Sequence, residues 1–185
     1  MEDLFLKAKH WQLFALLITL NVIVQAFFAF SLILSNYVPL LIILTAVVGG
    51  TFMFLFLSWF YYLIKGLNKK NHIQNLKTDS ANLNLFYLFP VVYILVISLF
   101  LPSGFTVSTE ESDTISALSI LIIVPTHLFS MYCIFYLMYK AAKTIKTAEV
   151  QKPVSFGDFA GEFFLLWFFP IGIWFLQPKI NKLAE

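Results

Sequence analysis

The chain has no arginine and little charge of either sign. Its 185 residues include 12 lysines and 10 Asp and Glu residues, so that only 12% of the sequence is charged. Soluble domains carry about 25% charged and about 45–50% apolar residues, whereas 60% of this chain is hydrophobic. A compact soluble surface with so little charge would expose large apolar patches. We therefore expect an all-α integral membrane protein, with one polytopic membrane domain over residues 1–185.

The missing arginines and the single cysteine exclude several kinds of site. Arginine is the usual residue for bidentate phosphate recognition, and nucleic-acid binding needs clustered Lys and Arg, so no nucleic-acid partner is expected. Cys133 is the only cysteine and cannot form an intramolecular disulfide, a CxxC redox pair or a cysteine zinc site. We expect Cys133 to pack as a small hydrophobic residue.

Sequence patterns of common enzymes are also missing. There is no GxSxG elbow, no P-loop and no GxGxxG fingerprint. Intramembrane aspartyl chemistry needs two Asp residues within spans, and the predicted spans contain none. The three histidines, His10, His72 and His127, are scattered, whereas a di-metal histidine box needs short spacings. We therefore expect a protein that is not an enzyme, with no catalytic residues, no metal and no cofactor.

Four apolar stretches are long enough, or nearly so, to cross a bilayer, which requires roughly 20 helical residues for a core of ~30 Å. They cover residues 11–35, 39–64, 85–101 and 115–139. The first is too long for the apolar region of a signal peptide. A tight turn separates it from the second, and Pro39 suits the first position of a helix. Residues 65–84 and 105–114 are predicted as loops, and the fourth helix is expected to continue toward Glu149.

The C-terminal stretch is shorter and interrupted. Residues 163–176 are apolar but contain Pro170 and Gly172, which suits a membrane-embedded segment that does not cross. Ser155 and Asp158 match a capping box, which predicts a helix start near Phe156. We therefore expect a membrane-associated helix over about residues 156–176, kinked at Pro170. The alternative is a fifth span over about residues 157–176.

The positions of the lysines predict the orientation. Lysines precede the first span, lie between the second and third, and follow the fourth, whereas the other two connections have none. By the positive-inside rule, both termini are then cytoplasmic in a multi-pass inner-membrane protein. If the last segment does not span, all 12 lysines lie on the cytoplasmic side, which is a second argument for that interpretation.

A few polar residues occur at the middle of the predicted spans. Asn21 and Gln25 share one helix face, and Thr51, Tyr93 and His127 are central in the other three spans. We predict that these five side chains form one polar layer near the bilayer centre. Three roles remain open: hydrogen bonding that holds the helices together, a ligand or permeant pathway, and a pH sensor.

Small residues and acidic residues provide two further candidate sites, one for helix packing and one for charge interactions. Thr45 with Gly49, and Ala46 with Gly50, are pairs spaced for close helix packing, within one chain or between copies. Asp158 and Glu162 lie one helical turn apart. They could form an acid–base pair or half a metal site, but a solvated helix face is the simpler interpretation.

A specific contact follows from that acidic face. Anionic lipid headgroups repel acidic side chains, so the tail would need a protein partner. We hypothesise that Asp158 and Glu162 dock against Lys65, Lys69 and Lys70.

The stretch from Glu162 to Asn181 resembles the tails of small uncharacterised polytopic bacterial membrane proteins. The resemblance covers about 20 of the 185 residues and implies a bacterial cytoplasmic membrane, but no function.

Our leading hypothesis is a non-enzymatic accessory protein that acts through its Lys-rich cytoplasmic face. Its expected partners are the lipid bilayer and a membrane or cytoplasmic protein, or a second copy. An oligomeric pore near His127 is the alternative, and a lipid-binding protein or membrane enzyme is a weaker one.

Overall fold

The computed structural model describes residues 2–33, 38–70, 82–104 and 113–184, and all regular secondary structure within them is helical. The all-α expectation is therefore confirmed. Seven helices follow one another in these residues: α1 (Glu2–Lys7), α2 (His10–Ile33), α3 (Val38–Lys70), α4 (Leu83–Gly104), α5 (Asp113–Val150), α6 (Phe156–Trp167) and α7 (Phe169–Ala184).

Helices α2 to α5 coincide with the four apolar stretches, but some boundaries differ from the prediction. The predicted loop over residues 65–84 begins too early, because α3 continues to Lys70. The third apolar stretch, 17 residues from Leu85, is short for a span and a start nearer Asn82 was expected; α4 starts at Leu83. The apolar stripe of α3 explains its extension, since Leu67 is buried beyond Lys65. The fourth helix continues past Glu149, as expected.

Two helices are long and apolar enough to cross a membrane, by length and composition, among the residues described with their side chains. They are Ile43–Lys69 within α3 and Leu121–Val150 within α5. The corresponding parts of α2 and α4, His10–Ile23 and Leu83–Ser98, are shorter apolar helices. On this criterion the number of candidate spans is two, and not the four predicted.

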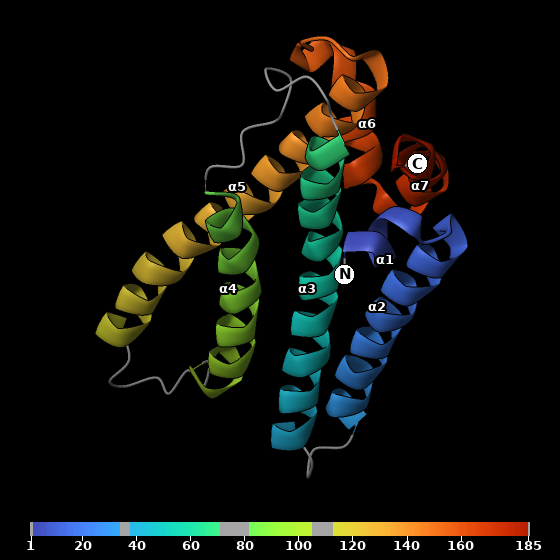
Figure 1. Ribbon diagram of the computed structural model, residues 1–185. Helices are drawn as coiled ribbons and strands as arrows, with labels where there is room; N and C mark the ends of the chain where they lie inside the picture. The colour runs from blue at the N-terminus through green and yellow to red at the C-terminus, as the bar shows by residue number, and fades with distance from the viewer. Residues whose placement is uncertain (1, 34–37, 71–81, 105–112, 185) are drawn as a thin grey trace.

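Helices α2, α3 and α4 lie side by side in that order, and α5 runs obliquely across α4 to the end of α3 (Figure 1). The hydrophobic core is concentrated toward one end of this arrangement, where α1, α6 and α7 pack against α3 and α5. Trp59 and Phe60 of α3, Ile145 of α5, Phe159 of α6 and Ile173 of α7 are completely buried there.

The C-terminal stretch forms a two-helix hairpin whose arms, α6 and α7, meet at a large angle and not antiparallel (Figure 1). The chain leaves the helical conformation at Phe168, where ψ is 55°, and Pro170 lies in the first turn of α7. The break is thus two residues before the predicted kink, because proline fits the first turn of a helix, where its missing N–H needs no partner. A continuous fifth span over residues 157–176 is not formed.

Candidate functional site at the charged end of the helices

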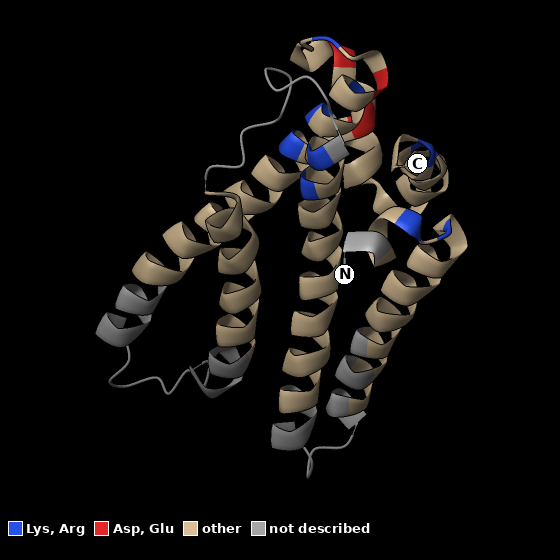
Figure 2. Cartoon of the chain, viewed as in Figure 1, with Lys and Arg blue, Asp and Glu red and all other residues tan. Residues whose placement is uncertain are grey.

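The charged residues whose side chains the structure describes gather toward one end of the molecule (Figure 2). They come from α1, α3, α5, α6, α7 and the segments next to these helices. Residues 10–64, 80–109 and 114–139 contain no Asp, Glu or Lys. The hairpin of α6 and α7 carries Lys179 and Lys182 to the same end as the lysines of α5. The charged end is therefore the candidate site for recognition of another molecule.

Helix α6 starts with the capping box that the sequence predicts. The backbone N–H of Ser155 donates to Asp158 Oδ2 at 2.8 Å, and the Ser155 hydroxyl lies 2.9 Å from the same oxygen. The helix begins at Phe156, which confirms the predicted start. Both hydrogen bonds stabilise the charged form of Asp158 and thereby lower its pKa, and the bond from the backbone N–H has the larger effect. Asp158 therefore serves to start the helix.

Glu162 lies within a cluster of four charged side chains that joins α5, α6 and α7. Lys179 Nζ is 2.9 Å from Glu162 Oε1 and 2.7 Å from Glu149 Oε2. Lys146 Nζ is 2.8 Å from Glu149 Oε2 and 3.6 Å from Glu162 Oε1. The Glu162 side chain is only 11% exposed. Two lysines and two carboxylates thus neutralise one another where the hairpin meets α5.

The predicted docking partners of the acidic face differ from those in the structure. Lys65, Lys69 and Lys70 were expected to bind it, but Glu162 pairs with Lys146 and Lys179 instead. The side chain of Lys70 lies outside the described ones. The reason is the sharp turn at Phe168, which packs α7 against α6 and places Lys179 of α7 beside Glu162. Asp158 is occupied by the cap of its helix.

Gln177 is a buried hydrogen-bonding centre that the sequence analysis missed. Its side chain is completely buried, and its Oε1 accepts from the Trp59 indole N–H at 3.1 Å. Its Nε2 donates to the backbone carbonyls of Phe5 at 2.7 Å and Ala8 at 3.1 Å. Asn181 also donates to the Ala8 carbonyl, at 3.1 Å. One amide thereby joins α7 to α3 and to the junction of α1 and α2.

The signal for this centre in the sequence is weak. Gln177 is a lone polar residue in an apolar run, and a Gln near a helix end is normally read as solvent-exposed. Its partners lie more than 100 positions away in the chain. Only the tertiary structure brings these groups together.

The five mid-span polar residues fall into separate groups. Gln25 donates to Asn21 at 2.9 Å within α2, and Thr51 donates to the Val47 carbonyl of its own helix at 2.8 Å. Only Tyr93 and His127 join two helices, with 3.1 Å between the Tyr93 hydroxyl and His127 Nδ1. An apolar cavity of about 430 Å³ between α4 and α5 adjoins this pair.

The two pairs of small residues have different surroundings. Ala46 and Gly50 are buried, and a Cβ at Gly50 would overlap the Leu95 side chain of α4. A Cβ at Gly49 would meet nothing within 4 Å, and Thr45 is half-buried. The close packing of Gly50 is therefore intramolecular, between α3 and α4.

Among the described residues, no three His, Cys, Asp or Glu side chains are grouped closely enough to hold a metal ion. Cys133 is buried, as expected for a small hydrophobic residue. No protein-family model, curated protein or solved structure matches this chain. The function must therefore be argued from the geometry of the chain itself.

Proposed function

We propose that this protein is a multi-pass membrane protein, in which α2 to α5 all cross the bilayer. Large apolar side chains are exposed on every one of these helices, among them Val22, Val47, Val92 and Leu128. Water would not tolerate so much apolar surface, whereas lipid tails solvate it. The backbones of α2 and α4 extend over 24 and 22 residues, which is enough for a core of ~30 Å.

We further propose that the hairpin of α6 and α7 enters the bilayer without crossing it. Its tip exposes Trp167, Phe168 and Ile171, whereas Lys179 lies at the charged end. Phe169 packs against Phe56 of α3, with ring centroids 5.1 Å apart. Phe56 precedes Lys65 by nine residues, or roughly 14 Å of helix. A tip at that depth lies near the middle of the bilayer.

The charged end then faces the cytoplasm, because lysines favour that side of a bacterial inner membrane. We propose that the protein is a non-enzymatic interaction protein, which binds an acidic surface of a membrane or cytoplasmic protein at this end. The observation that carries the proposal is the charge imbalance. Lysines of α3 and α5, such as Lys69 and Lys143, have no carboxylate within 4 Å among the described side chains, whereas Glu149 and Glu162 are already paired.

Site-specific photo-crosslinking in cells tests this function. A photoreactive residue at Lys69 or Lys143 should give one discrete protein adduct, and the same residue at Val47 should not give it. Replacing neighbouring lysines by Gln should abolish the adduct, since each contributes about 1 kcal/mol or less at an exposed surface but several act together. An adduct that survives these replacements, or no adduct at either position, would contradict the proposal.

The alternative function is a pore formed by several copies around α4 and α5. It is favoured by the lateral exposure of His127. In that case the purified protein would make vesicles permeable to ions, and His127→Gln would abolish the permeability. Intact vesicles with the protein inserted would leave the interaction function as the better explanation.

A further inference from the structure

The imidazole of His127 uses one of its two ring nitrogens in a contact with α4. The Tyr93 hydroxyl lies 3.1 Å from Nδ1, and the structure gives Nε2 no hydrogen-bond partner among the described residues. A neutral imidazole has one N–H donor and one acceptor nitrogen. When the Tyr93 hydroxyl donates to Nδ1, the ring proton is on Nε2, which can then donate to a ligand.

An apolar cavity of about 430 Å³ between α4 and α5 adjoins this nitrogen. Tyr93 and His127 are the polar side chains of its wall, and the other five are aliphatic: Ile94, Ile97, Ile123, Val124 and Leu128. Val124 and Leu128 are 49% and 60% exposed, so the cavity opens to the side of the helices. Binding sites for small molecules have such a composition, with apolar walls and a few polar groups that orient the ligand.

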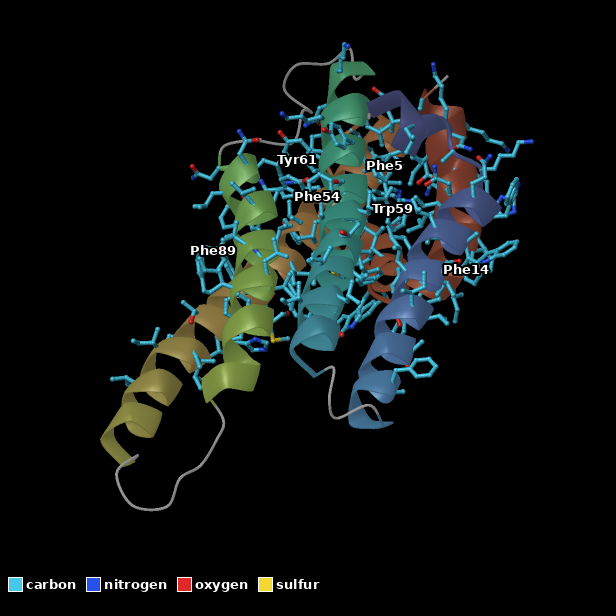
Figure 3. The ribbon with its side chains drawn as sticks, turned by 90° about the horizontal axis from the view of Figure 1, so that it is seen from below. Phe5, Phe14, Phe54, Trp59, Tyr61 and Phe89 are labelled. Carbon is cyan, nitrogen blue, oxygen red and sulfur yellow. The ribbon has the colours of Figure 1, made fainter. Side chains whose placement is uncertain are left out.

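The position of the cavity follows from the path of α5 past α4. Phe89 and Phe129 hold the two helices together one turn nearer to the charged end, with ring centroids 4.7 Å apart. Figure 3 labels Phe89 on α4, and Figure 1 shows that the two helices diverge beyond this contact. The cavity therefore lies between two helix walls that move apart, and this wedge can accept a flat ring.

The depth of His127 in the bilayer limits the kind of ligand. Asn84 accepts a hydrogen bond from Tyr61 near the charged end, and Tyr93 follows Asn84 by nine residues, or roughly 14 Å of helix. In a core of ~30 Å, this distance puts the pair near the middle. The phosphate and ester groups of a phospholipid stay at the headgroup level, so that only its acyl chain reaches the cavity. An acyl chain leaves Nε2 without an acceptor, which is costly in hydrocarbon.

We propose that this cavity binds the ring of an isoprenoid quinone, with His127 Nε2 donating to a carbonyl oxygen. A quinone is neutral and dissolves in the bilayer core, and its carbonyl oxygens are acceptors. Its flat ring lies against the aliphatic walls and Tyr93, and its apolar tail leaves through the open side past Leu128. The site depends on the membrane placement of α4 and α5 proposed above, but not on a protein partner.

Native mass spectrometry of the full chain in detergent tests the site with decylubiquinone as the probe. We expect a one-quinone adduct, and none with decylbenzene, which has the same alkyl chain but no carbonyl oxygen. Ile123→Phe should fill the cavity and weaken the adduct about tenfold or more. Ile122→Phe is the matched control and should retain the adduct, because Ile122 is 66% exposed and does not line the cavity.

NMR of isotopically labelled histidine nitrogens tests the hydrogen bond directly. Decylubiquinone should shift the Nε2 resonance of His127 and leave the other two histidines unchanged. The absence of this resonance from His127→Leu assigns it. The same variant should weaken the quinone adduct about fivefold, since it removes one hydrogen bond.

Three results would overturn the quinone site: equal binding of decylbenzene, equal effects of the two Ile→Phe variants, or a bound quinone that leaves the Nε2 resonance unchanged. Thermal unfolding of every variant checks that the fold is intact, and the NMR shift is measured on the natural sequence. Membrane fractionation of the same cells reports separately on the placement. The photo-crosslinking adduct reports on the protein partner, so the failures can be distinguished.

Discussion

Individual residues in this protein have roles that depend on how far away their partners lie. The Ser155–Asp158 capping box is local, so its three-residue spacing sufficed to predict both the contact and the start of α6. Gln177 contacts groups in α3 and before α2, and nothing in its neighbourhood indicates this. The mid-span residues include both local and long-range contacts. Asn21 accepts a hydrogen bond from Gln25 in its own helix, whereas Tyr93 of α4 hydrogen-bonds to His127 of α5.

Gln177→Leu tests whether the buried amide stabilises the fold. The change keeps much of the side-chain volume but leaves the Trp59 indole N–H and the Phe5 carbonyl without their partner. Burying such groups unpaired should lower the free energy of unfolding by about 1–3 kcal/mol. Thermal unfolding in detergent measures the effect, and the exposed Gln151→Ala is the control. Equal unfolding temperatures for the two variants would show that Gln177 is dispensable.

At the scale of the element, the hairpin of α6 and α7 is the feature that changes most between sequence and structure. Its 14-residue apolar run was predicted to be one kinked helix that does not cross the bilayer, and the structure forms two helices there. The sharp turn at Phe168 was not predicted. A proline in the first turn of a new helix and a proline that kinks a continuous helix have the same sequence pattern. Once the turn is made, Lys179 meets Glu162.

Gly172→Ala tests the close approach of the two helices. A Cβ at Gly172 would overlap the backbone carbonyl oxygen of Leu165, which cannot move without opening the hairpin. We expect a destabilisation of about 1–3 kcal/mol, as for overpacked cores, and faster proteolysis after Lys152. Gly161→Ala is the matched control, because a Cβ there meets nothing within 4 Å. If both variants resist proteolysis equally, the tight packing at Gly172 is unimportant.

In the whole molecule, the charged side chains and the buried core are both concentrated toward the same end of the helices. The core lies toward the charged end, whereas the remaining lengths of α2 to α5 expose apolar side chains. Such an arrangement suits a protein anchored in lipid with one end in the cytoplasm, where the hairpin and α1 complete the packing.

Cysteine labelling in a Cys133→Ser background checks this orientation. A membrane-impermeant thiol reagent should label Ser108→Cys in intact cells, because the proposed orientation puts residues 105–112, which contain Glu110 and Glu111 but no lysine, outside the cytoplasm. Ala148→Cys and Lys182→Cys should react only after lysis, since both lie at the charged end. Labelling of Lys182→Cys from outside would mean that the C-terminal hairpin crosses the bilayer.

The sequence by itself determined that the described chain is all-α, because the length and periodicity of its apolar runs depend on no tertiary contact. It also determined where the helices lie to within a few residues, and the capping box that starts α6, since both follow from local periodicity and hydrogen bonding. Only the tertiary structure decided which side chains meet: Gln177 with Trp59, Glu162 with Lys146 and Lys179, and Tyr93 with His127. Those contacts depend on the turn at Phe168 and on the oblique path of α5. Local sequence patterns do not determine either feature, because other packings of the same helices would bury the same apolar faces.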